Sequence, residues 1–512
     1  MSQTQRGYRK VLCDRTLPAC TRCVLSGRTC EGYGTRLSWP RENDARRSMI
    51  GPAPPEQSGA VVRPDLRLVN ASSWDIQLHG LVAAPTGHVD VSLAAPQRLP
   101  VQTLGTPPSG PPQALQRLLN TSIPWTDLLH DSVERSLFEY FVHEASFSIT
   151  TFGHDAFKIR ETLIRMALVN TPSSTAILKS ALALASFHRD NPTSQTTGLK
   201  ISALRALAAS TGGTIGPAES MCHVAAGMIL CTLEFHQTSA VSSHWLWYVC
   251  GSKTIIKTAR LDEMTQTIDF TALVGWVHYC DVMARFSLRH WKPNFNLFEG
   301  DPSNVTFEAF KPGVCADVQP ANLVGPPHEI LYVLSEVFDT VVGPSDARFE
   351  TEDYREYLKV LEWRLRSIRT TEPDNQVMIG TTSPDFSTVI ELFQLAALVY
   401  LRRASAGIFP VNSFHDQWVD RAFRLIAELP TCQWPFPLFV LGCEAHTDEQ
   451  RLTILDCIAR TEGSLRFRNL EPVKRIIQAV WVQNDLFDKG LDYVHKLGVI
   501  LSSTFKAVPA LI

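Results

Sequence analysis

YREYLKVLEWRLRSI, residues 354–368, carries the clearest structural pattern in this chain. Apolar side chains recur every three or four residues, at Tyr354, Leu358, Leu361, Leu365 and Ile368. Arg and Glu occupy positions between them. Because an α-helix turns once every 3.6 residues, this spacing places the apolar side chains on one face and the charged ones opposite. The stretch therefore predicts an amphipathic helix packed against a larger core.

The helical period continues on both sides of this stretch. Apolar side chains recur every four residues at Leu129, Val133, Leu137 and Phe141. Further helical segments are residues 176–187, 221–233, 245–261, 270–286, 386–401 and 418–429. Alternating strand patterns and Asx-Gly hairpin turns are almost absent. We predict an all-α body over residues 125–512, with roughly fifteen helices and no fixed-period repeat.

Residues 41–124 have a different composition. Of the 32 prolines in the chain, 12 lie between residues 40 and 112, where they are accompanied by Gly and Ser. Proline lacks a backbone N–H and clashes with the preceding helical turn, so no long helix can run here. We predict a disordered Pro-rich linker over residues 41–124, with local order around residues 66–82.

Charge divides the chain into a basic head and an acidic remainder. Residues 1–47 hold ten Lys and Arg but four Asp and Glu, although the whole chain has a net charge of −3. Such a basic segment predicts contact with a polyanion. Residues 1–12 are polar and basic, unlike a signal peptide, and no apolar run approaches the ~18–20 residues that span a bilayer. We expect an intracellular, reducing compartment and no membrane contact.

Four of the twelve cysteines, Cys13, Cys20, Cys23 and Cys30, lie within the first thirty residues. Their spacing, C-x6-C-x2-C-x6-C, suits a tetrahedral zinc site, and clustered cysteines in a reducing compartment bind metal rather than form disulfides. Residues 1–40 have almost no apolar core, so we expect this module to be unfolded without the metal. The other eight cysteines are scattered among apolar residues, as is typical of reduced core thiols.

The cysteine head resembles the last two-thirds of the six-cysteine zinc binuclear cluster of fungal transcription factors. The matching pieces are Cys13-Asp14, Pro18, Cys20, Arg22-Cys23, Gly27-Arg28-x-Cys30 and the segment 32–39 that follows. The resemblance implies a nuclear protein with zinc as its cofactor and double-stranded DNA, at CGG-type triplets, as its partner. It also implies a zinc-cluster DNA-binding module over residues 1–40.

The same resemblance assigns roles to the basic residues of the head. Arg9 and Lys10, four and three positions before Cys13, stand where the family's base-reading residues lie. Arg or Lys paired with guanine is the commonest specific base contact. Four further arginines would contact phosphates without reading sequence, namely Arg15, Arg22, Arg28 and Arg36. The alternative is that these basic residues form a solvated, disordered arm.

Two thiolates of the family pattern are missing. The family's first and second cysteines would fall on Gln3 and Arg6. A complete two-zinc cluster therefore cannot form. The four cysteines that are present could still hold one zinc. Either the true reading frame starts upstream and encodes both cysteines, or the cluster is degenerate and DNA binding is weakened or lost. We favour the first explanation because the family features downstream of Cys13 are intact.

The body carries a second resemblance, to the fungal-specific transcription factor domain. It rests on residues 434–445 with Arg451 following, on residues 278–287, and on Val480-Trp481. It implies an α-helical regulatory region, and no ligand residues can be carried over from it.

The residues of these segments also admit a physical interpretation. Trp434 and Pro437 would cap a helix that begins near Leu438, and Glu444 could form an ion pair with Arg451. Core packing is favoured over a ligand site. The same interpretation applies to four histidines among apolar residues, His223, His236, His244 and His278, which we expect to be satisfied core side chains.

No catalytic motif is evident. The sequence has no G-x-x-x-x-G-K-[ST], G-x-G-x-x-G, G-x-S-x-G or H-E-x-x-H, so we do not expect an enzyme. The candidates for a catalytic nucleophile with an activating partner are Cys443 with Glu444, or Cys231 with a nearby His. A helical enzyme or small-molecule binder is the remaining hypothesis outside transcription.

We predict a sequence-specific regulator of RNA polymerase II genes that contacts the transcription machinery. By analogy with relatives, its role would be pathway-specific, for example in secondary metabolism. If a homodimer forms, the body makes it, because the linker shows no heptads. The alternative is a family member that no longer binds DNA and acts by protein–protein contact.

Overall fold

The computed structural model describes residues 69–83, 131–153, 156–190, 192–212, 215–237, 243–261, 268–291, 323, 325–343, 346–369, 384–406, 408–409, 414–464, 470–486 and 492–512. All of these lie in one unit, Leu68–Ile512. They form sixteen α-helices and one short 3-10 helix, and they contain no strand. The all-α prediction is therefore confirmed. None of the described helices combines the length and apolar character that a bilayer-spanning segment needs.

The helices have the following bounds, in chain order: α2 Ser73–Ala83, α3 Ser132–His143, η2 Ala145–Ser148, α4 Ala156–Ala167, α5 Pro172–Asp190, α6 Ser194–Ser210, α7 Pro217–His236, α8 His244–Thr258, α9 Ile268–His290, α11 Pro326–Thr340, α12 Glu352–Ser367, α13 Pro384–Ala404, α14 Phe414–Glu428, α15 Pro435–Cys443, α16 Asp448–Ser464, α17 Glu471–Leu486 and α18 Tyr493–Thr504.

Capping residues fix where several helices begin. The Thr351 hydroxyl accepts a hydrogen bond from the Tyr354 N–H at the start of α12, and Asp492 does the same for His495 at the start of α18. Such caps satisfy backbone N–H groups that have no partner inside the helix. Helices α7, α11 and α15 begin instead with a proline, whose missing N–H costs nothing in the first turn.

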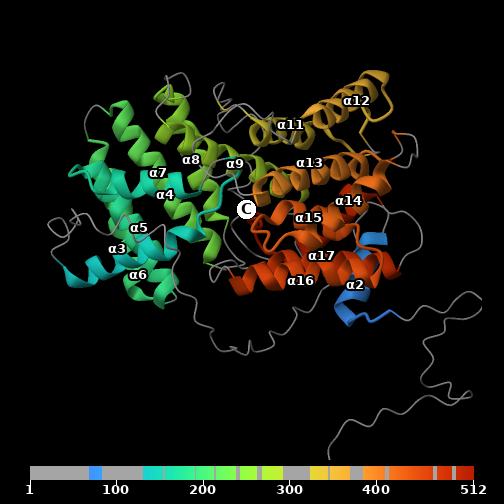
Figure 1. Ribbon diagram of the computed structural model, residues 1–512, viewed down its shortest axis with the longest axis horizontal. Helices are drawn as coiled ribbons and strands as arrows, with labels where there is room; N and C mark the ends of the chain where they lie inside the picture. Colours follow the sequence, from blue (N-terminus) through green and yellow to red (C-terminus); the bar gives the residue numbers. More distant parts are fainter. Residues whose placement is uncertain are drawn as a thin grey trace, which may run out of the picture. The chain divides into compact units, whose positions relative to one another are not determined.

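The first half of the body is built around α5. Eleven of its residues are buried, and α3, α6 and α7 pack against it, while α8 packs on α7. These helices lie together on one side in Figure 1, in cyan and green. Small side chains such as Ala181, Ala183 and Ala185 let the neighbouring helices approach α5 closely.

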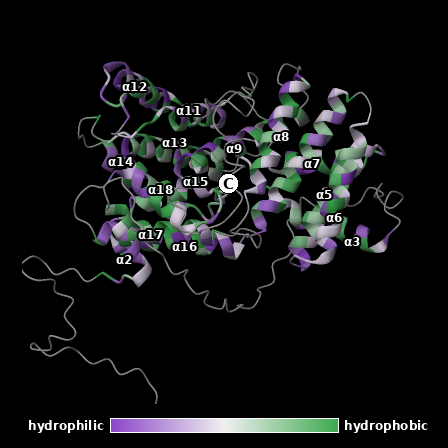
Figure 2. Cartoon of the chain, turned by 180° about the vertical axis from the view of Figure 1, so that it is seen from behind, coloured by the Kyte–Doolittle hydropathy of each residue, from purple (hydrophilic) through white to green (hydrophobic). Residues whose placement is uncertain are grey.

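The second half is built around α13 and α15. Helix α13 packs against α11, α12, α14 and α15, and α15 packs in turn against α16 and α17. All nine residues of α15 are buried. Figure 2 shows the result: α15 lies among hydrophobic residues, whereas α12 and α14 at the edge carry hydrophilic ones.

Helix α9 joins the two halves. It packs against α4, α7 and α8 of the first half and against α11 and α18 of the second. Its Phe286 ring lies 5.2 Å from Phe338, 5.4 Å from Phe436 and 5.5 Å from Tyr400, measured between ring centroids. Four helices therefore share one aromatic core, and such contacts add to the free energy gained by burial alone.

Helix α2 lies within the segment that the sequence analysis assigned to the linker, at the place where it expected local order. It packs against α17 and α18, and its Leu78 and Val82 side chains are buried. The fully buried Gln483 of α17 binds it through two contacts: its Nε2 donates to the Asp75 carbonyl at 3.0 Å, and its Oε1 lies 3.0 Å from His79 Nδ1. Residues 73–83 thus belong to the packed body.

Candidate functional site

The structure does not place the predicted zinc and DNA site. The zinc ligands Cys13, Cys20, Cys23 and Cys30 lie outside the described residues. The same holds for the predicted DNA contacts Arg9, Lys10, Arg15 and Arg22. These eight assignments stay predictions, and the site that the structure does describe is the interior of the body.

Helix α15 is formed by the segment 434–445 that the sequence analysis singled out. It begins at Pro435, not near Leu438 as expected, because a proline is well accommodated at the first helical position. The Trp434 indole N–H donates to the Thr151 carbonyl at 3.0 Å, and the Trp481 indole N–H donates to the Gly442 carbonyl at 2.6 Å. These residues pack the core, so the core interpretation is confirmed.

Close packing of α15 on α17 depends on a glycine. A Cβ atom added to Gly442 would lie 2.7 Å from Ile477 Cδ1 and 3.1 Å from Ile477 Cγ1. Real Cβ atoms do not approach other carbon atoms this closely, and Ile477 is itself fully buried. The hydrogen at this position therefore sets the distance between the two helices.

Glu444, directly after α15, is a buried charge with two partners. Only 2% of its side chain is exposed, and it accepts hydrogen bonds from Arg403 Nε at 2.7 Å and from His415 Nε2 at 3.3 Å. Burial raises the pKa of the Glu444 carboxyl, but the His415 hydrogen bond and the Arg403 charge outweigh it, so the pKa lies below its usual value. Glu444 is therefore ionised at neutral pH.

The expected ion pair between Glu444 and Arg451 is wrong. Arg451 instead binds both oxygens of Asp485 at 2.8 Å, which joins α16 to α17. The partner of Glu444 comes from α13, 41 positions earlier in the chain, and no local sequence pattern connects the two.

The second family-like segment, residues 278–287, lies in the middle of α9. Its Asp281 accepts hydrogen bonds from Lys253 Nζ of α8 at 2.8 Å and from Arg285 Nε at 3.2 Å. Arg285 also pairs with Asp339 near the end of α11. A chain of alternating charges therefore ties α8, α9 and α11 together, and it runs from the buried Lys253 to the exposed Asp339.

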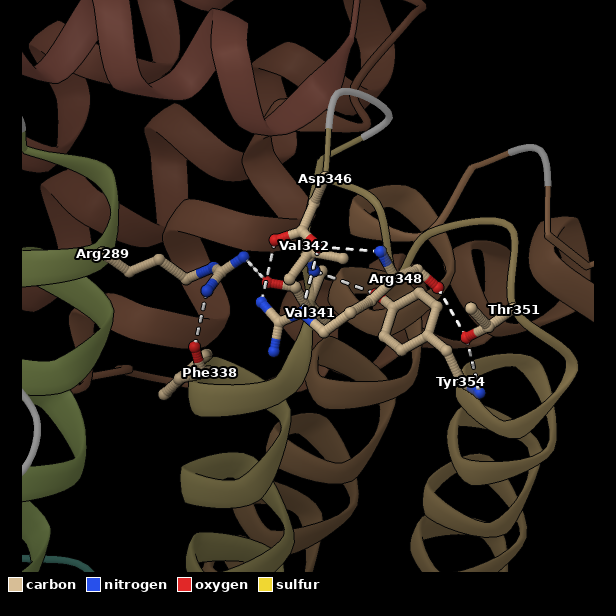
Figure 3. Close-up of polar contacts among 8 residues, drawn as sticks. All are labelled: Arg289, Phe338, Val341, Val342, Asp346, Arg348, Thr351 and Tyr354. Atoms are coloured by element: carbon tan, nitrogen blue, oxygen red, sulfur yellow. Dashed lines mark hydrogen bonds and ion pairs between the residues drawn. The ribbon is translucent and has the colours of Figure 1, made fainter.

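Arg289, one turn further along α9, holds the end of α11 (Figure 3). Its guanidinium donates to the Phe338 carbonyl at 2.7 Å and also to the Val341 carbonyl. These carbonyls lie in and just after the last turn of α11, where the helix offers them no N–H partner. Tyr354 of α12 completes the arrangement, because its hydroxyl accepts the Val342 N–H at 2.9 Å.

Three of the four singled-out histidines are buried or half-buried. His223 lies 2.7 Å from the Ser210 hydroxyl, and the His236 ring packs edge-on against His188. His278 packs against the Tyr332 ring, and burial lowers its pKa to about 4, so it is neutral at physiological pH. His244 differs from the expectation, because it is exposed at the first position of α8.

Most of the described cysteines are buried thiols of the core. Burial raises the pKa of Cys231 and of Cys443, so neither forms a thiolate readily near neutral pH. Six of the cysteines within the described residues are free, and five of these are buried. Cys250 departs from the expectation of a reduced thiol, because it is disulfide-bonded. In the part of the chain that the structure describes, no three His, Cys, Asp or Glu side chains are grouped as a metal site requires.

Sequence reasoning missed two elements of this interior. Arg403 and His415 could not be paired with Glu444, because they lie on other helices. The position of Gln483 could have been recognised from the sequence. It is a polar residue at helical spacing from the apolar Val473, Ile476 and Val480, on the face of α17 that is buried. A polar side chain on an apolar face indicates a specific hydrogen-bonding partner, which here is α2.

Comparison with known proteins agrees with this architecture. Residues 136–499 match the family described as the fungal specific transcription factor domain. The chain is also similar to a protein named transcription factor iacI from Pestalotiopsis fici, at 35% identity over 392 residues, which cover 75% of this chain and 97% of that protein. No solved structure matches the chain. The matched residues run from α3 into α18, and the chain therefore belongs to the family of proteins with a fungal specific transcription factor domain.

Proposed function

We propose that this protein is a zinc-dependent, sequence-specific DNA-binding regulator of RNA polymerase II transcription, whose helical body is the regulatory part. The observation that carries the proposal is the family match of the body together with the C-x6-C-x2-C-x6-C head that precedes it on the same chain. The body supplies a large packed scaffold. Its described interior is built of core aromatics and charge pairs, as a structural role would require.

Zinc is the cofactor that the head chemistry favours. Cys13, Cys20, Cys23 and Cys30 provide four thiolates, the number that a tetrahedral structural zinc takes. The segment has too few apolar side chains to fold by burial alone, so the free energy of metal binding would supply its free energy of folding.

DNA is the partner that the charge of the head favours. Arg9 and Lys10 are proposed to read guanine edges of a CGG-type triplet, and Arg15 and Arg22 to contact phosphates. The nucleus is the proposed location of the protein, since the proposed partner of the head is chromosomal DNA. The transcription machinery is the proposed second partner, contacted by the body.

The zinc proposal is tested by metal analysis of the full chain. We expect one zinc per chain, and its loss in Cys20→Ser, because three thiolates hold the metal much more weakly than four. Cys222→Ser is the matched control, since Cys222 is a free, half-buried thiol on α7. It should keep the zinc. A full complement of zinc in Cys20→Ser would contradict the proposed ligand set.

The DNA proposal is tested by binding to duplexes with and without a CGG triplet. Arg9→Ala with Lys10→Ala should remove the preference between the two, a loss of about tenfold or more for two base contacts. Arg15→Ala or Arg22→Ala should weaken binding to both duplexes equally and reduce the slope of log affinity against log salt by about one. Arg205→Ala, exposed on α6, is the control and should change neither quantity. An unchanged preference in the double variant would show that other residues read the bases.

A second candidate function is regulation through protein contacts without DNA reading. The transcription factor iacI is matched over nearly its whole length by three quarters of this chain, so about a quarter of this chain has no counterpart in that protein. A reporter gene controlled by this protein distinguishes the two functions. If Cys20→Ser regulates as well as the unchanged protein, the contact function is supported and the DNA-reading function is contradicted.

A further inference from the structure

The outward face of α12 carries large apolar side chains that the body leaves exposed. Trp363 is 67% exposed, Val360 47% and Tyr357 42%. The opposite face of the same helix, including Leu358 and Leu361, is fully buried against α11 and α13. Trp363 has the largest exposed fraction of the large hydrophobic side chains in the described part of the chain. Because these three side chains follow one another at a spacing of three residues, they form a continuous exposed apolar patch, and such a patch indicates a surface that another molecule covers.

Helix α12 lies at the edge of the body, where a partner can reach it. Both views show it beyond α11 and α13, with no labelled helix on its outer side (Figures 1 and 2). It packs against α11 and α13, and Arg366 near its end also lies over the Phe414 ring of α14, 5.1 Å from the ring centroid. Among the described residues, Tyr357, Val360 and Trp363 therefore stay exposed on this side of the helix.

The charges on this face are divided between its two ends. Glu352, Asp353 and Glu356 are exposed in the first half of the helix. From Lys359 onward, the exposed charges of the helix and of the residues just after it are basic, namely Lys359, Arg366 and Arg369. Trp363 lies between the acidic first turns and the basic end. The face thus changes from acidic to basic along its length, with an apolar middle.

We propose that this face binds the same face of a second copy of the chain, with the two α12 helices antiparallel. A twofold axis near the middle of the helix would place the acidic end of each copy against the basic end of the other. The opposed helix dipoles favour the same arrangement. Because the charge order reverses along one face, the face is complementary to itself, which points to a second copy as the partner.

The existing ion pairs of α12 do not prevent this exchange. Glu356 pairs with Lys359 at 2.7 Å and Glu352 with Arg355 at 3.9 Å, and these side chains are 44–69% exposed. Exposed pairs of this kind contribute little free energy, so they can be replaced by pairs between copies. Arg366, which also lies 3.7 Å from Glu362, keeps half of its side chain exposed for a further partner.

Trp363 is expected to supply most of the affinity, and the charges to set the antiparallel register. The proposal rests on the described body and not on the cysteine head. A dimer would therefore form whether or not the head holds zinc, and failure of the dimer would leave the proposed DNA function untouched.

The first test measures the mass of the full chain against concentration by analytical ultracentrifugation. We expect a reversible dimer, and Trp363→Ala should raise its dissociation constant about tenfold or more, as loss of a central interface tryptophan does. Trp247→Ala is the matched control, since Trp247 is 48% exposed on α8. It should leave the dissociation constant unchanged. Both variants should keep the helical circular dichroism of the unchanged protein, since neither side chain is in the core.

The second test uses charge reversal to distinguish a self-complementary interface from other dimers. Glu352→Lys with Glu356→Lys makes the face mostly basic, and Lys359→Glu with Arg366→Glu makes it mostly acidic. Each variant alone should dimerise weakly, whereas an equal mixture of the two should form a heterodimer at about the strength of the unchanged protein. Glu161→Lys, exposed on α4, is the control for charge reversal elsewhere.

Three results would overturn the proposal. One is a chain that stays monomeric at every concentration, which would show that the outer face of α12 does not bind a second copy. Another is a dimer that Trp363→Ala leaves intact. The third is a mixture of the two reversed variants that associates no better than either alone.

Discussion

At the residue scale, Glu444 shows how a buried charge is kept ionised by partners from distant parts of the chain. Glu444→Gln keeps the size of the side chain but removes the charge that Arg403 and His415 face. Breaking a buried ion pair costs ~3–5 kcal/mol, and because Arg403 is 37% exposed we expect a smaller loss, about 2 kcal/mol in the free energy of unfolding at pH 7. Urea unfolding followed by circular dichroism measures it.

The pH dependence gives this prediction a second readout. A carboxyl whose pKa is lower in the folded than in the unfolded state stabilises the fold above its unfolded pKa, near 4.3. That contribution is lost as the pH falls through the folded pKa. The difference between the unchanged protein and Glu444→Gln should therefore shrink below about pH 4.3. Glu391→Gln, in an exposed pair with Arg421, is the control and should cost less than about 0.5 kcal/mol. Equal losses at both sites would contradict the assigned burial.

Two tyrosines of α12 provide a comparison of hydroxyl groups. Tyr354→Phe should lower the free energy of unfolding by about 1–2 kcal/mol, because it leaves the buried Val342 N–H without its acceptor. Tyr357→Phe should cost less than about 0.5 kcal/mol, since its hydroxyl donates to Glu336 at an exposed position. Thermal unfolding of both variants measures the difference, and a larger loss for Tyr357→Phe would exclude the role given to Tyr354.

At the scale of elements, the contact between α15 and α17 is set by the absence of a side chain at Gly442. Gly442→Ala forces its Cβ against the fully buried Ile477 side chain, which would have to shift within the packed core. We expect a loss of about 1–3 kcal/mol in the free energy of unfolding, as for other overpacked cores. Gly251→Ala, in open space on α8, should instead stabilise the protein by about 0.5–1 kcal/mol. Stabilisation by Gly442→Ala would mean that the two helices can separate without cost.

Docking of α2 depends on one buried amide. Gln483→Leu removes both contacts to α2 and leaves the Asp75 carbonyl without its donor. We expect faster hydrogen exchange of the residue 73–83 amides, by about tenfold for the loss of roughly 1.4 kcal/mol, with the rest of the body unchanged. Gln478→Leu, exposed on the same helix, is the control. Unchanged exchange in Gln483→Leu would show that apolar contacts alone hold α2.

The sequence predicted these elements better than it predicted their partners. The segments 245–261, 270–286 and 354–368 each fall largely within α8, α9 and α12, because a long run of apolar side chains at helical spacing has few alternatives. The helix ends were less well predicted, since they depend on caps such as Thr351 and on Pro435. The pairing of Glu444 with Arg403 could not be predicted, because it joins helices 41 positions apart and follows from packing.

At the scale of the whole molecule, the body is one helical unit in which α9 joins two halves and α2 docks from a distant segment. Its family was evident from short signatures around Trp434 and His278, and both signatures are core-building segments in the structure. The candidate zinc ligands followed from cysteine spacing, because metal ligands are recognised by their number and order. The candidate DNA contacts Arg9 and Lys10 followed from the family resemblance of the head. The spacing of residues 354–368 predicted the buried face of α12, but it did not reveal that Val360 and Trp363 stay exposed, because another helix could equally have covered them.

The central claim is that zinc organises the head so that this family member prefers a DNA sequence. The most direct measurement is the ratio of affinities of the full chain for a CGG-containing duplex and a matched duplex without CGG, at one salt concentration, before and after zinc is removed by a chelator. The account predicts a preference of about tenfold or more with zinc bound, lost on chelation while the helical circular dichroism of the body is retained. Equal affinities for the two duplexes in the zinc-bound protein would contradict it.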